Sequence, residues 1–102
     1  MWTPITQAEL ENKIAQEKLF LESDILQFLE IISISPEKWA EEEHGEMGGG
    51  FWVVAIFGKS IIWYNDIEEG FNVSQFDTFG KIGEYAAEQD MLGWTINKIL
   101  KT

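Results

Sequence analysis

The stretch of residues 51–79 constrains this chain most, because its pattern predicts three strands joined by two turns. The first strand covers residues 51–57 and is apolar at every position. By the alternation of a strand, one face carries Phe51, Val53, Ala55 and Phe57, and the other carries Trp52, Val54 and Ile56. A tight turn at Gly58 and Lys59 leads into the second strand, residues 61–64, which is also apolar on both faces. This hairpin therefore needs a covering layer on each side.

The third strand, residues 71–75, alternates apolar with polar side chains, as expected of a strand with one face in water. We predict that it forms the edge of the sheet. The turn before it spans residues 65–70. There we expect Asp66 to stabilise the turn, Gly70 to relax it, and the glutamates to stay in water.

Residues 77–85 have helix-like spacing but include Gly80 and Gly83, and a glycine weakens a helix by about 1 kcal/mol against alanine. We therefore expect an extended or looped connection, with a short fourth strand as the alternative. A last helix is predicted from about Glu88 to Leu100, where apolar residues recur at helical steps.

The N-terminal half is predicted to be helical. Thr6 and Glu9 match a capping box, so a helix is expected to begin there. Apolar residues continue at helical spacing toward Ile32, but the stripe is interrupted at residues 17–18. Residues 7–32 form either one long helix or two. We favour two, with Ser23 or Asp24 capping the second.

Ser35 and Pro36 suit the cap and the first position of a further short helix that carries Trp39. Residues 41–50 are acidic and glycine-rich and predict a mobile loop. The elements together predict an α+β fold with N-terminal helices, an antiparallel three- or four-stranded meander over about residues 51–79, and a C-terminal helix. At 102 residues the chain is expected to be a single domain, 1–102.

The chain is strongly acidic, since 18 Asp and Glu stand against 7 cations and give a net charge of −11. All the cations are lysines, so the bidentate arginine contacts to phosphate are missing and we expect no nucleic-acid partner. The acidity serves either solubility through self-repulsion or the attraction of a basic partner.

The absence of cysteine removes disulfides and thiolate chemistry. No apolar run approaches the roughly 18 to 20 residues of a membrane span, and the first residues lack the pattern of a signal peptide. We therefore expect a cytoplasmic protein without a membrane partner.

Few residues offer catalytic or cofactor chemistry. His44 is the only histidine and lies among Glu41, Glu43 and Glu46, but this spacing matches no defined set of metal ligands. The glycines at 48–50 precede a predicted strand, whereas a phosphate-binding loop precedes a helix. We expect no metal site, no cofactor and no catalytic residue.

The aromatic side chains and the acidic turn beside them are the candidate site. Most aromatics are expected to fill the core. If the helices of so short a chain leave one face of the hairpin uncovered, that face becomes a dimer contact or a partner site. The candidate partner or ligand surface consists of Trp52, Trp63, Tyr64, Asp66, Glu68, Glu69 and Phe71.

The run of residues 63–72, Trp-Tyr-Asn-Asp-Ile-Glu-Glu-Gly-Phe-Asn, resembles the signature of a family of small uncharacterised bacterial proteins. Residues 50–54, Gly-Phe-Trp-Val-Val, resemble an upstream stretch of that family. The resemblance covers about residues 48–76. It implies a bacterial source and assigns no activity or site.

These observations favour a non-enzymatic binding protein that forms a homodimer through its sheet. The most concrete form of this hypothesis is an immunity- or antitoxin-like protein whose acidic side chains cover a basic toxin surface. The alternative is a small-molecule-binding protein or an enzyme, with an aromatic pocket between the sheet and the N-terminal helices. Trp52, Trp63 and Tyr64 would line that pocket.

Overall fold

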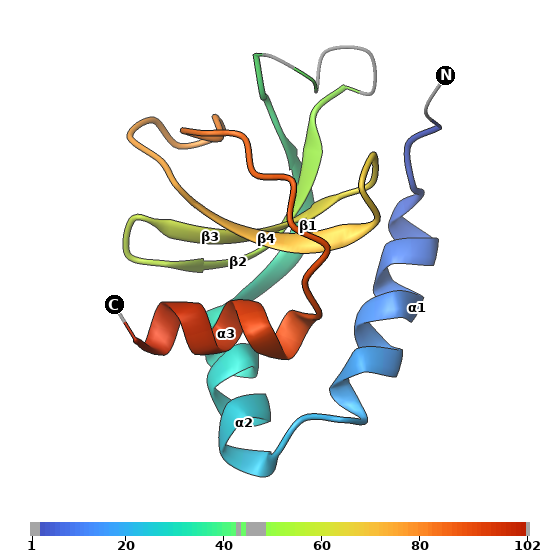
Figure 1. The fold of residues 1–102 in the computed structure, drawn as a ribbon, viewed down its shortest axis with the longest axis vertical. Coiled ribbons are helices and arrows are strands. Elements are labelled where there is room, and N and C mark those ends of the chain that lie inside the picture. The colour runs from blue at the N-terminus through green and yellow to red at the C-terminus, as the bar shows by residue number, and fades with distance from the viewer. Residues whose placement is uncertain (1–2, 43, 45–48, 102) are drawn as a thin grey trace.

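The structure is a computed structural model that describes residues 3–42, 44 and 49–101. It confirms the predicted α+β class (Figure 1). Two helices precede a four-stranded antiparallel sheet with the strand order β1-β2-β3-β4, and a third helix follows it. The elements are α1 (Gln7–Lys18), α2 (Ser23–Ile32), β1 (Ser33–Trp39), β2 (Phe51–Phe57), β3 (Ser60–Asn65), β4 (Gly70–Gln75) and α3 (Leu92–Leu100). β4 lies at an edge of the sheet, as predicted.

The N-terminal helices confirm the preference for two helices over one. The capping box of α1 is formed, because Thr6 Oγ1 accepts from the Glu9 N–H and Glu9 Oε1 accepts from the Thr6 N–H, both at 3.1 Å. The predicted cap of α2 was wrong. Its N-cap is Glu22, so Ser23 and Asp24 both lie inside the helix.

The short helix predicted around Trp39 was also wrong, because residues 33–39 form strand β1. Trp39 pairs with Phe51 across the β1–β2 ladder and is only 1% exposed. This long-range pairing outweighs the local helix signal of Ser35 and Pro36. Pro36 falls where the register shifts on an outer strand, a place that tolerates its missing N–H. The fourth strand thus precedes the predicted meander.

A β-bulge in β2 changes which side chains share a face. Val53 pairs with Trp63 and Ala55 with Ile62, so Val54 is an extra residue between them. Val54 and Ala55 consequently pack on the same side of the sheet, in the cluster under the helices. The predicted grouping of Ala55 with Val53 was therefore wrong, since the bulge shifts the alternation by one residue.

Both faces of the sheet are covered. The three helices and their side of the sheet bury one hydrophobic cluster, which is made of Leu10, Leu29, Ile32, Val54, Ala55, Ile62, Tyr64, Phe71, Leu92, Ile96 and Ile99. The other face buries a second cluster, which is made of Trp39, Phe51, Val53, Ile61, Trp63 and Ile82. Residues 76–90, which we name the strap, lie over this second face (Figure 1). The uncovered aromatic face considered for a dimer contact is thus filled by the chain's own C-terminal half.

The sequence predicted that the polar face of β4 lies in water. Asn72 and Ser74 of this strand instead bind the backbone of the strap, and only Gln75 is exposed. Asn72 is 1% and Ser74 is 2% exposed. Asn72 Nδ2 donates to the Glu88 carbonyl at 2.9 Å, and Asn72 Oδ1 accepts from the Glu88 N–H at 2.8 Å. Ser74 Oγ donates to the Glu84 carbonyl at 2.8 Å. These side chains supply the hydrogen bonds that an irregular backbone needs when it covers a sheet.

The strap also reaches the outer edges of both edge strands. Ala40, just after β1, accepts from the Ile82 N–H at 2.9 Å, and Phe71 of β4 donates its N–H to the Asp90 carbonyl at 3.0 Å. Gly70 permits the close approach, since a Cβ there would lie 2.3 Å from the Gln89 Cα. The looped connection predicted for residues 77–85 is confirmed, and α3 begins only at Leu92 because residues 88–90 bind β4.

Replacement of Asn72 tests the strap contacts. Asn72→Ala should lower the free energy of unfolding by about 2 to 3 kcal/mol, because it removes two hydrogen bonds between a buried side chain and the strap backbone and empties the space that the side chain fills. Urea denaturation followed by circular dichroism measures this. The matched control is Asn97→Ala on the exposed face of α3, where alanine should be neutral or slightly stabilising. Equal effects of the two substitutions would contradict this role of Asn72.

Candidate functional site

The structure separates the seven residues of the candidate surface into buried and accessible members. Trp63 and Phe71 are 0% exposed and Tyr64 is 4% exposed. Trp63 belongs to the cluster under the strap, whereas Tyr64 and Phe71 belong to the cluster under the helices. These three aromatics therefore stabilise the two cores and do not share a surface.

Trp52 and Asp66 hold the segment that leads into α1. Trp52 Nε1 donates to the Ile5 carbonyl at 2.9 Å, and Asp66 Oδ2 accepts from the Ile5 N–H at 2.8 Å. Lys38 Nζ lies 5.0 Å from the centre of the Trp52 ring, within the range of a cation–π contact. Two residues predicted to meet a partner thus bind the backbone of Ile5.

The turn between β3 and β4 is stabilised by a different residue from the one expected. Asn65 Oδ1 accepts from the N–H groups of Ile67 at 3.0 Å and Glu68 at 3.2 Å, as in an Asx turn. The left-handed conformation falls on Glu69, with φ at 59°, and not on Gly70. The roles predicted for Asp66 and Gly70 in this turn were therefore wrong. Glu68 is partly exposed and Glu69 is exposed, as predicted for the glutamates.

A hollow of about 300 Å³ lies between the start of α1 and this turn, and we name it the turn hollow. Its charged lining residues are Glu9, Asp66 and Glu69, and the Tyr64 side chain lines it as well. Burial raises the pKa of the Tyr64 hydroxyl above its usual value, and the charges of Glu69, Asp66 and Glu17 raise it further. The hollow is consequently a region of negative potential.

A second hollow, of about 270 Å³, lies between the end of β1 and the strap, and we name it the strap hollow. Its charged lining residues are Glu41, Glu42, Asp77, Lys81 and Glu84. Lys81 pairs with Glu42, and this hydrogen bond and the lysine charge lower the pKa of the Glu42 carboxyl. The backbone bridge between Ala40 and Lys81 brings these two distant stretches together.

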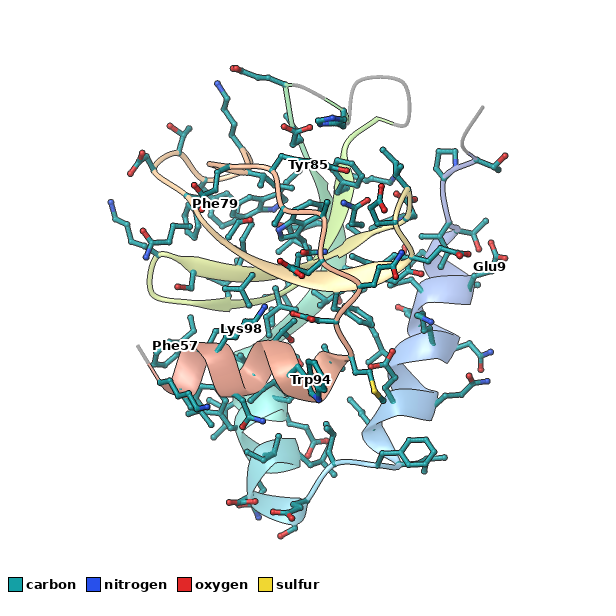
Figure 2. All side chains as sticks on the ribbon, in the orientation of Figure 1. Glu9, Phe57, Phe79, Tyr85, Trp94 and Lys98 are labelled. Atoms are coloured by element: carbon teal, nitrogen blue, oxygen red, sulfur yellow. The ribbon has the colours of Figure 1, made fainter. Side chains whose placement is uncertain are left out.

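The aromatic wall of the strap hollow is Tyr85. Its ring stacks on His44 with the ring centres 3.8 Å apart, and its hydroxyl accepts from Asn65 Nδ2 at 2.9 Å. Figure 2 shows Tyr85 on the opposite side of the sheet from Trp94 and Lys98 of α3. Sequence reasoning missed this site because residues 41–42 and 77–85 are far apart in the chain, and no spacing motif links them.

A third hollow, the helix pocket, has a volume of about 230 Å³ and lies between α1, α2, the first two strands and the start of α3. It occupies the place predicted for a ligand pocket between the sheet and the N-terminal helices. Its lining is mainly aliphatic and includes Ile14, Leu29, Val54 and Leu92. The prediction that Trp52, Trp63 and Tyr64 line this pocket was wrong, because none of them is among its lining residues. Glu11 and Lys18 of α1 supply the charged part of its lining.

Within residues 3–42, 44 and 49–101, no three His, Asp or Glu side chains come together in a way that could hold a metal ion. The metal-ligand cluster considered around His44 includes Glu43 and Glu46, which lie outside these residues. Most of the loop after Glu42, which was predicted to be mobile, also lies outside them. None of the described helices is both long enough and apolar enough to cross a membrane.

Comparison with known proteins gave no relative: no family model, curated protein or solved structure matches the chain. The resemblance of residues 48–76 to a bacterial family therefore stays a prediction.

The raised pKa of Tyr64 predicts a loss of stability in alkali. The folded chain holds this proton more tightly than the unfolded chain, so the associated stability is present below the usual tyrosine pKa of about 10 and is lost as the pH rises through the raised value. Tyr64→Phe should reduce the fall in unfolding free energy between about pH 7 and pH 11. Urea denaturation at both pH values measures it.

The ionisation itself can be followed separately, because the chain has only two tyrosines. In Tyr85→Phe, the ultraviolet absorbance of tyrosinate reports Tyr64 alone. Ionisation of Tyr64 at the ordinary value for tyrosine would contradict the assignment.

Proposed function

We propose that this chain is a non-enzymatic binding protein whose two acidic hollows receive lysine and arginine side chains of a basic partner protein. The observation that carries the proposal is the lining of the strap hollow, where Glu41, Glu42, Asp77 and Glu84 outnumber Lys81. The turn hollow adds further carboxylates. An immunity- or antitoxin-like role in the cytoplasm of a bacterium is the most concrete form of this proposal.

Electrostatics favour such a partner in two ways. A net charge of −11 attracts a cationic protein over a distance of about 10 Å at moderate salt and raises the rate of encounter. Carboxylates that line a concave surface then pair with individual cations at short range, which gives specificity. The acidic residues thereby gain a role beyond solubility.

Neutralisation of the strap hollow tests the proposal. A triple variant with Glu42→Gln, Asp77→Asn and Glu84→Gln should weaken binding of the basic partner at least about tenfold, since each exposed ion pair contributes up to about 1 kcal/mol. The partner is first captured with a photo-crosslinking residue at Glu84 and identified by mass spectrometry. Its affinity for each variant is then measured by calorimetry.

The matched control changes the net charge equally but on α2 and its cap, with Glu22→Gln, Asp24→Asn and Glu30→Gln, all at exposed positions. This control should bind within about threefold of the natural chain, because long-range charge effects are partly screened by salt. Equal loss in both triple variants, or capture of a partner without a basic surface, would contradict the proposal.

The helix pocket supports a second candidate function, the binding of a small apolar molecule, because its lining is mainly aliphatic. Methyl NMR spectra of Ile14 and Leu29 should shift when an apolar fragment binds there. Ala15→Leu, which adds volume to the lining, should abolish those shifts. If no fragment of a broad library shifts these methyl signals at millimolar concentration, this function is contradicted.

A further inference from the structure

Large apolar side chains are exposed mainly on the helical side of the molecule. Among the described residues, the exposed members are Leu19, Phe20, Ile31, Phe57, Phe79, Met91, Trp94 and Leu100. Only Phe79 lies on the strap. Single exposed apolar residues need no explanation, but a group of them at one place indicates an interaction surface.

Four of these residues lie where the turn after α1 meets the start of α3, and we name them the junction patch: Leu19, Phe20, Met91 and Trp94. Two contacts establish the junction. Glu17 Oε1 accepts from the Leu92 N–H at 2.6 Å, and a Cβ on Gly93 would lie 3.0 Å from Leu21 Cδ2.

The exposure of the junction patch is high. Leu19 is 81%, Phe20 79%, Met91 52% and Trp94 63% exposed. Met91 is the N-cap of α3 and Trp94 lies in its first turn, where the Trp94 N–H donates to the Met91 carbonyl at 3.0 Å. Figure 2 shows Trp94 on the outer surface of α3. An exposed tryptophan flanked by apolar residues is typical of the centre of a protein interface.

The charges around the junction patch nearly cancel, unlike those of the chain as a whole. Lys18 and Glu22 flank it in sequence on one side, and Asp90 pairs with Lys98 at 2.5 Å on the other. Glu17 faces the N-terminus of α3, whose partial positive charge offsets the carboxylate. Two copies of a chain with a net charge of −11 repel each other, and the paired charges beside the junction patch add little to this repulsion.

We propose that two copies of the chain associate through the junction patch about a twofold axis, with Trp94 of each copy packed against the patch of the other. A contact about a twofold axis requires a surface that complements itself. A neutral apolar patch with charges of both signs at its rim meets this requirement. This proposal moves the dimer contact expected at the sheet to the helices. It does not depend on a basic partner, because the strap hollow lies on the other side of the sheet.

Sedimentation equilibrium of the purified chain alone tests the dimer. The average mass should rise from 11.7 kDa toward twice that value between about 10 µM and 1 mM, since a small interface gives a dissociation constant of roughly 10 to 100 µM. Trp94→Ser should raise this constant at least about tenfold. Phe79→Ser, at another exposed aromatic residue, is the matched control and should leave it unchanged.

Indole NMR signals locate the contact without any substitution. The indole N–H groups of Trp39, Trp52 and Trp63 donate to Glu37, Ile5 and Ser74 within the chain. The signal of Trp94 should therefore shift as the concentration rises, while these three stay constant. If circular dichroism shows that the Trp94→Ser variant does not fold, Phe20→Ser takes its place in the sedimentation experiment, with the same expected weakening of the dimer.

Three outcomes would overturn the proposal: a mass of 11.7 kDa throughout the concentration range, equal weakening by Trp94→Ser and Phe79→Ser, or concentration-dependent shifts at the other indoles but not at Trp94. A dimer that forms through the junction patch in the absence of any partner supports the proposal. This result is independent of whether a basic partner binds the acidic hollows.

Discussion

The hydrogen bonds between the polar side chains of the sheet and the backbone of the strap are the constraint on which the rest of the structure depends. A sheet that is apolar on both faces must be covered twice, and the helices of this chain cover one face. The other face is covered by a segment without regular structure, whose backbone groups need partners. Asn65, Asn72 and Ser74 provide them, with Asn65 Nδ2 donating to the Ala86 carbonyl at 2.9 Å.

The same contacts create the acidic site. Because Ser74 and Asn72 fix the strap at Glu84 and Glu88, the preceding residues pass beside the end of β1 and bring Asp77 and Glu84 near Glu41. The chain thus uses neutral amide and hydroxyl groups to position carboxylates. Charge and packing have separate roles here: uncharged polar groups hold the backbone, and the carboxylates line the hollow.

Local patterns in the sequence predicted the elements whose partners are near in the chain. The capping box at Thr6 and the β2–β3 hairpin depend on neighbouring residues and were found as expected. Strand β1 and the burial of Asn72 depend on contacts with more distant segments, which no local period encodes. The burial of Trp63, Tyr64 and Phe71, which were predicted to belong to a partner surface, was missed for the same reason, because aromatic content does not show which rings a distant segment will bury.

The second core holds the strap beside the acidic hollow. Four carboxylates line this hollow with one lysine, and that lysine is paired with Glu42. The strap is held in place because Ile82 is buried with Trp39 and Phe51 beneath it and its backbone is bonded to both edges of the sheet. A cationic side chain bound in the hollow would pair with the remaining carboxylates while leaving the core contacts unchanged. Binding of a basic partner would therefore stabilise the strap as well as the complex.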